Sequence, residues 1–122
     1  MFYKDLDVYK KSIDFVVDIY KTTESFPDSE KFGLVSQLRR ASVSLPSNLA
    51  EGSGRNGRKE LLNFLHIARG SLFEIKTQLE ISHRLGFVSQ DDYDKLEERR
   101  ATIQRMMNAL ISSLRKKGEN ND

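Results

Sequence analysis

The chain has 122 residues, no cysteine and two prolines, and its 20 basic residues nearly balance its 18 acidic residues. This length predicts one domain, and the missing cysteines exclude disulfides and thiolate metal sites. The mild charge balance argues against a nucleic-acid-binding surface over the whole protein, but it allows local basic clusters. Abundant Leu, Glu, Lys and Arg predict an all-α protein. Without a long apolar run or a signal peptide, we expect it in the cytoplasm.

The first predicted helix runs from about Asp5 to Ser25 and carries apolar residues on two opposite faces. With about 100° per residue, the face expected to form the core stripe comprises Leu6, Tyr9, Ile13, Val16, Val17 and Tyr20. The opposite face carries Val8, Phe15 and Ile19. In a lone four-helix bundle that second face would meet water, so it predicts a subunit interface, with simple exposure as the alternative.

Pro27 then breaks the chain, because proline cannot continue a helix, and Asp28 or Ser29 is expected to cap the second helix. The second helix places a core stripe on one face: Leu34, Leu38, Ala41, Leu45 and Leu49. Glu30 is expected in its first turn, where a carboxylate favours the helix dipole.

The segment "SVSLPSNLAEGSGR", residues 42 to 55, interrupts this helical pattern with Pro46. The proline leaves the Ser42 carbonyl without its helical donor, which predicts a kink. A true break with Asn48 capping a new helix is the alternative, but Gly52 and Gly54 leave that helix almost no length. The leucine stripe continues in phase across the proline, so we expect one kinked helix and then a loop.

The third helix is expected from near Gly57 to Gly86, and the fourth follows a cap at Ser89. Their predicted core residues are Leu61, Phe64, Leu65, Ala68, Leu72, Ile75 and Leu79, then Tyr93, Leu96, Ile103, Met107, Leu110 and Leu114. Short connections predict an all-α, antiparallel up-and-down four-helix bundle with the second helix kinked at a proline. We expect one domain over residues 1–117 and a frayed polar tail over 118–122.

A ladder of polar residues runs beside the core stripe of the second helix and faces polar residues on the third. Its members are Gln37, Arg40, Ser44, Asn48 and Glu51, opposite Arg69, Ser71 and Glu74. Gly70 and Ser71 are small enough to let another helix approach closely. The ladder is either an internal hydrogen-bond network that fixes helix register or a pocket or partner groove, and the sequence leaves both open.

Several stretches resemble the 23S rRNA intervening-sequence protein family, also called the four-helix bundle proteins, over roughly Asp5 to Met107. The most specific stretches are "QLRRA" from Gln37, Ser44, "PSN" from Pro46, "AEG" from Ala50, and "ARGS" from Ala68 with Glu74. The resemblance implies a small cytoplasmic bacterial protein whose four-helix bundle assembles into a ring-like homo-oligomer, plausibly a pentamer. It also implies kinship with accessory proteins of reverse transcriptases, in which a basic surface contacts nucleic acid, and it implies no reaction.

Known catalytic and metal-binding patterns are incomplete in this sequence. Glu80 and His83 have the E-x-x-H spacing of di-iron bundles, but such sites need a second motif, and His66 has no glutamate three residues before it. The glycines of residues 52–57 follow no strand and precede no G-K-[ST], so they do not form a P-loop. We therefore expect a non-enzymatic protein with no catalytic residues, cofactor or metal.

Three basic clusters make nucleic acid one candidate partner: Arg39 and Arg40; Arg55, Arg58 and Lys59; and Arg115, Lys116 and Lys117. A symmetric ring would repeat each cluster and strengthen binding to RNA or DNA phosphates. The alternative is a solvated surface, on which Arg40 or Arg69 simply pairs with Glu51 or Glu74. The competing function is a scaffold that presents a groove to a protein partner, such as a nucleic-acid enzyme.

Overall fold

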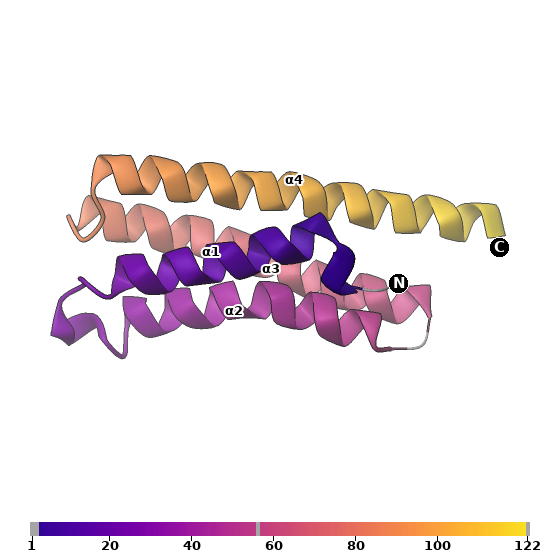
Figure 1. Ribbon diagram of the computed structural model, residues 1–122, viewed down its shortest axis with the longest axis horizontal. Coiled ribbons are helices and arrows are strands. Elements are labelled where there is room, and N and C mark those ends of the chain that lie inside the picture. Colours follow the sequence, from indigo (N-terminus) through magenta and orange to yellow (C-terminus); the bar gives the residue numbers. More distant parts are fainter. Residues whose placement is uncertain (1–2, 56, 122) are drawn as a thin grey trace.

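A computed structural model describes residues 3–55 and 57–121 of the chain, with side chains described through Gly118. Within this part the chain is helical and has no strand: η1 (Tyr3–Asp5), α1 (Asp7–Thr23), η2 (Asp28–Glu30), α2 (Leu34–Ser53), α3 (Arg58–Arg84) and α4 (Gln90–Asn121). The four α-helices lie along one axis with their connections at alternating ends, so consecutive helices run in opposite directions (Figure 1). One apolar core receives side chains from all four helices. The predicted four-helix bundle is confirmed.

The two apolar faces of α1 are exchanged relative to the prediction. Val8, Phe15 and Ile19, expected at a subunit interface, are buried in the core of the single chain with 5%, 1% and 0% of their surfaces exposed. Of the expected core stripe, Ile13, Val17 and Tyr20 face outward and are 39%, 45% and 42% exposed, whereas Leu6 and Tyr9 are partly buried against the core. The prediction that Val8, Phe15 and Ile19 form an interface is therefore wrong.

Polar atoms explain which face of α1 enters the core. The inner face includes Ser12 and Thr23, whose hydroxyls donate to the carbonyl oxygens of Val8 and Ile19 at 2.7 Å in both cases. Such bonds to the preceding turn let small polar side chains be buried without losing a partner. The outer face contains Tyr20, whose hydroxyl would need a partner inside the core. Burying the face with Phe15 therefore costs less than burying the face with Tyr20.

The connection between α1 and α2 is longer than predicted. Pro27 ends the preceding turn, but residues 28–30 form only the short helix η2, and α2 begins after Gly33 without a side-chain cap. The expected capping of α2 by Asp28 or Ser29 is therefore wrong. Glu30 still serves the start of α2, because its Oε2 lies 3.5 Å from the backbone nitrogen of Leu34.

Helix α2 continues through Pro46 to Ser53, so the predicted continuous helix is confirmed, while its kink stays a prediction. Near its end α2 approaches α3 closely at Gly52. A Cβ atom at this position would lie 2.9 Å from Leu61 Cδ1 and 3.0 Å from Phe64 Cβ. Gly70, in contrast, faces open space, so the expected close approach at that residue is wrong.

Both ends of the α3–α4 connection follow the predicted capping chemistry. Gly86 has a φ of 83°, and its N–H and that of Phe87 donate to the carbonyls of His83 and Ser82 at 3.0 and 2.9 Å. These bonds form a Schellman motif, which closes α3. The backbone N–H of Asp92 donates to Ser89 Oγ at 3.2 Å, so Ser89 caps α4 as expected.

Helix α4 contains a buried arginine that the sequence analysis did not predict. Arg100 is 3% exposed, bonds to Glu97 and Gln104 on its own helix, and donates to the Leu72 carbonyl of α3 at 3.4 Å. The backbone of α4 remains helical to Asn121, beyond the boundary predicted at residue 117, and projects past the other helices (Figure 1). Asp122, the last residue of the predicted tail, lies outside the described residues.

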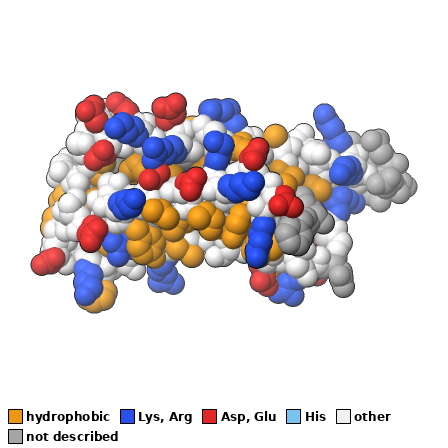
Figure 2. Space-filling view, viewed as in Figure 1, with side chains coloured by type: hydrophobic (Ala, Val, Ile, Leu, Met, Phe, Trp, Pro, Cys, Tyr) orange, Lys and Arg blue, Asp and Glu red, His pale blue; other side chains and the backbone are white. Residues whose placement is uncertain are grey.

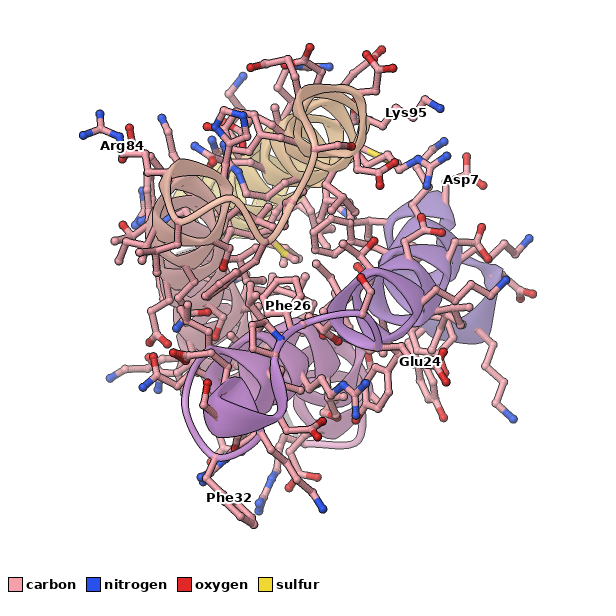
Figure 3. The ribbon with its side chains drawn as sticks, turned by 90° about the vertical axis from the view of Figure 1, so that its left-hand side faces the viewer. Asp7, Glu24, Phe26, Phe32, Arg84 and Lys95 are labelled. Carbon is pink, nitrogen blue, oxygen red and sulfur yellow. The ribbon has the colours of Figure 1, made fainter. Side chains whose placement is uncertain are left out.

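Two phenylalanines mark the end of the bundle that carries the α1–α2 and α3–α4 connections. Phe26 points inward between the helices, and its ring lies 5.5 Å from that of Phe87 (Figure 3). Phe32 points away from the bundle and is 89% exposed (Figure 3). Phe26 therefore closes this end of the core, whereas Phe32 contributes little to it.

Candidate functional site

An open groove of about 360 Å³ lies between α2 and α3 and contains much of the predicted polar ladder. It is lined by Gln37, Arg40, Ala41, Ser44, Ser71, Glu74 and Gln78. Side chains that are distant in sequence meet here because α2 and α3 run side by side. The ladder therefore borders a surface groove and also contributes to the contact between the helices.

Hydrogen bonds at the base of this groove join α2 to α3. The hydroxyl oxygens of Ser44 and Ser71 lie 2.6 Å apart, and Ser44 Oγ also lies 2.7 Å from the Ala41 carbonyl oxygen. One turn further along α2, Asn48 donates from Nδ2 to the Ser44 carbonyl at 2.7 Å. Because these groups are buried or half-buried, losing one partner would leave a polar atom poorly solvated. This part of the ladder is an internal network.

Besides Asn48, the ladder residues Glu51 and Arg69 do not line the groove. Glu51 accepts a hydrogen bond of 2.7 Å from Arg55, and both side chains are about half exposed, so this ion pair adds little stability. Arg69 turns away from α2 and contacts His66 and Asn108 on the α4 side. The sequence spacing placed Arg69 on the correct helix but could not give the direction of its long side chain.

The groove also contains a residue that the sequence analysis missed. Gln78 lines the groove, and its buried Oε1 has no hydrogen-bond partner among the described residues. It follows Glu74 by four residues, so helical spacing alone would have placed it on the same face. The expected alternative pairing of Arg40 or Arg69 with Glu51 or Glu74 is absent among the described side chains.

The first basic cluster is divided between two sides of α2. Arg39 faces α1, where its Nε donates to Thr23 Oγ1 at 3.0 Å and its guanidinium lies 4.4 Å from the centre of the Tyr20 ring. Arg40 lies on the other side, in the α2–α3 groove. These neighbouring arginines therefore do not form one cationic patch, and Arg39 mainly ties α1 to α2.

The other two basic clusters meet at the end of the bundle where α4 projects. The Arg58 side chain lies so close to Gly118 that a Cβ atom there would collide with the guanidinium. Lys59, Lys116 and Lys117 are exposed. Figure 2 shows Lys and Arg side chains gathered on this projecting end. Residues from the first turn of α3 and from the last turns of α4 thus contribute to one basic surface.

A larger groove, of about 740 Å³, lies between α1 and α4 and was not predicted. Its apolar lining residues are Phe15, Val17 and Ile103, of which only Val17 is exposed. Its charged lining residues are Lys11, Asp14, Asp18, Lys21, Lys95, Glu98 and Arg99. Arg99 and Asp18 form an ion pair across it. This groove combines a small apolar area with charges of both signs.

Two titratable side chains have shifted pKa values. Burial of the imidazole, followed by the neighbouring guanidiniums of Arg69 and Arg115, lowers the pKa of His66. Burial of the phenol and then nearby carboxylates raise the pKa of Tyr93, whose ring stacks 4.6 Å from that of His83. Within the described residues, no three His, Cys, Asp or Glu side chains gather as a metal site. None of the described helices has the length and hydropathy of a membrane span.

The model of a family described as 23S rRNA-intervening sequence protein matches residues 4–109 of the chain. The chain belongs to this family. The matched region contains the α2–α3 contact, with Gly52 and the Ser44–Ser71 hydrogen bond. Arg115, Lys116 and Lys117 lie beyond the match, on the continuation of α4.

The chain is similar in fold to a solved structure from Bacteroides thetaiotaomicron, a protein of unknown function from the S23 ribosomal protein family. The TM-score is 0.80 with 24% sequence identity, over 86% of this chain and 95% of that chain. A likeness at this identity establishes the fold. No curated protein matches the chain.

Proposed function

We propose that this chain is a non-enzymatic helical module that assembles with copies of itself and serves as a scaffold for a protein partner. The observation that carries the proposal is the outer face of α1, which comprises Ile13, Val17 and Tyr20. These residues follow one another at intervals of four and three, so they lie on one side of the helix. Several exposed apolar residues on one face support a role in protein contact.

The surroundings of the outer face of α1 favour a second copy of the chain as its occupant. Val43 is also exposed and follows Arg39 by one turn, on the α1-facing side of α2. Figure 2 shows hydrophobic side chains gathered across this front side of the molecule. Val17 also lines the α1–α4 groove, whose charges of both signs can pair with opposite charges on a different surface of another copy.

A contact between two different surfaces of identical chains closes into a ring when the rotation between copies allows it. The resemblance described above favours a pentamer in the bacterial cytoplasm, and we adopt both as parts of the proposal. In such a ring the α2–α3 groove of every copy remains available to a partner, such as a nucleic-acid enzyme that the ring serves as an accessory protein.

The assembly is tested by light-scattering mass on a sizing column. Val17→Lys should lower the mass toward that of one chain and leave the helical circular dichroism unchanged, because the side chain is already exposed. Ile81→Lys is the matched control, since Ile81 is 44% exposed on α3 and Val17 is 45% exposed on α1. A wild-type mass of one chain, or equal effects of both substitutions, would contradict the proposed interface.

Direct binding to the RNA or DNA backbone is the second candidate function. It is supported by the basic surface at the projecting end of α4. There the cluster of Arg55, Arg58 and Lys59 meets the cluster of Arg115, Lys116 and Lys117. Replacing Lys59, Lys116 and Lys117 with Ala should weaken binding about equally across sequences and flatten its salt dependence. Lys95→Ala, on α4 but in the α1–α4 groove, is the control. The absence of salt-dependent binding to mixed RNA and DNA would rule this function out.

A further inference from the structure

We infer that His66 and Arg69 of α3 and Arg115 of α4 form a binding site for a phosphate group. The two guanidiniums approach the same imidazole from its two nitrogens. Arg69 Nη2 lies 3.1 Å from His66 Nδ1, and Arg115 Nη2 lies 3.1 Å from His66 Nε2. Arg69 also donates from Nη1 to Asn108 Oδ1 at 3.4 Å. Two adjacent helices thus direct hydrogen-bond donors into one small region of the surface.

This arrangement has more hydrogen-bond donors than acceptors. A guanidinium can only donate, and a neutral imidazole has one acceptor nitrogen, while its other nitrogen carries a hydrogen. At most one of the two contacts with His66 can therefore be a hydrogen bond. In the other contact, an N–H group of one arginine faces the N–H group of the ring. An oxyanion beside the ring would give these opposed donors a common acceptor.

The positive charge of the cluster also lacks a carboxylate to balance it. The ion pairs between described side chains, in residues 3–55 and 57–118, join Arg55, Arg84, Arg99 and Arg100 to acidic residues and do not include Arg69 or Arg115. Two guanidiniums held on either side of one ring repel each other. A phosphate would offset this repulsion, and its oxygens match the paired donors of a guanidinium.

The histidine couples phosphate binding to proton uptake. The charged groups that face it are Arg69 from its own helix and Arg115 from α4, and together with burial they lower its pKa. Its ring is therefore mostly neutral in the free protein at pH 7. A bound phosphate would reverse the local charge and raise the pKa of His66, so the ring would take up a proton and donate from both nitrogens. Binding of a polynucleotide phosphate, whose charge does not change in this range, should consequently strengthen as the pH falls toward 6.

The ligand is defined by its phosphate group, which either inorganic phosphate or a polynucleotide can supply. The site lies on the α3–α4 side of the bundle, away from the proposed assembly face on α1. It therefore does not depend on self-assembly. Arg115 is the one residue that it shares with the basic clusters of the nucleic-acid candidate.

The test is an NMR titration of the histidine rings in the full chain, with inorganic phosphate compared with chloride at equal ionic strength. Phosphate should raise the pKa of His66 by roughly one unit, the shift typical of a nearby opposite charge. His83, the other histidine of the chain, is the internal control, because it stacks on Tyr93 away from this cluster. Arg69→Gln and Arg115→Gln should abolish the shift, and Arg105→Gln on α4 should preserve it.

A second titration with a short single-stranded oligonucleotide distinguishes the two sources. A shift with inorganic phosphate supports a site for free phosphate, and a shift with the oligonucleotide alone supports a site for the polynucleotide backbone. The inference is overturned if neither ligand shifts His66 more than His83, or if the shift persists in Arg69→Gln and Arg115→Gln. The assembly variant Val17→Lys should retain the shift, so this inference and the proposed function can fail separately.

Discussion

The contact between α2 and α3 and the contact between α1 and α4 differ sharply within one bundle. At the α2–α3 contact, Gly52 lets the helices approach closely and Ser44 bonds to Ser71. Between α1 and α4 a groove of about 740 Å³ remains, and the ion pair of Arg99 with Asp18 crosses it. Small residues close the first contact, whereas long charged side chains border the second.

Because of this difference, the two contacts should respond differently to substitution. A closely packed contact fixes the arrangement of its helices, because interiors at native density tolerate little change in volume. An open groove lined by long side chains can accept changes or a partner at small cost. We therefore expect substitutions at the α2–α3 contact to change stability more than comparable substitutions at the α1–α4 groove.

The largest expected effect comes from filling the α2–α3 contact. Gly52→Val should lower the free energy of unfolding by about 1–3 kcal/mol, because the added atoms collide with Leu61 and Phe64. Gly70→Ala is the control in open space, and it should raise that free energy by about 0.5–1 kcal/mol through better helix propensity. Urea denaturation measures both, and a stable Gly52→Val variant would show that the contact is looser than described.

A smaller effect is expected from the hydroxyl pair at the same contact. Ser44→Ala and Ser71→Ala should each cost about 1 kcal/mol, as usual for a partly buried hydrogen bond. Because the hydroxyls bond to each other, the double variant should be less destabilised than the sum of the single variants. Additive losses in this double-mutant cycle would mean that the helices are not coupled through these hydroxyls.

The smallest effect is expected across the α1–α4 groove. Asp18→Asn should change the free energy of unfolding by less than about 1 kcal/mol, because the Arg99 side chain is 54% exposed and the Asp18 side chain 28%. The loss should shrink further as salt is added, since screening weakens exposed ion pairs. A loss as large as that of Gly52→Val, independent of salt, would remove the distinction between the two contacts.

The sequence predicted best those features that depend on local pattern. Apolar periodicity identified all four helices, and local chemistry correctly placed the cap at Ser89 and the end of α3 at Gly86. The spacing of the polar ladder correctly predicted that Ser44 and Ser71 face each other, and both line one groove. Such features depend on residues a few positions apart, or on helices that must pack side by side.

Features that depend on a choice between similar alternatives were predicted less well. Helix α1 has two apolar faces, and counting apolar residues favoured the wrong one. The count ignored the Tyr20 hydroxyl, which would need a partner in the core. It also ignored Ser12 and Thr23, whose hydroxyls bond to the preceding turn of their own helix. Periodicity also cannot give the direction of a long side chain, so it missed the turn of Arg69 toward His66. The width of the α1–α4 groove depends on tertiary packing and leaves no simple pattern in the sequence.

The buried Arg100 has a consequence for how the bundle avoids misalignment. The inner faces of α3 and α4 are mostly aliphatic and offer few directional contacts against small shifts along the helix axis. Glu97 and Gln104 would move together with Arg100, because they belong to the same helix. The Leu72 carbonyl would not, so sliding would deprive a desolvated cation of an acceptor on the facing helix. The Arg100 side chain therefore favours the observed register of α3 and α4 over neighbouring registers.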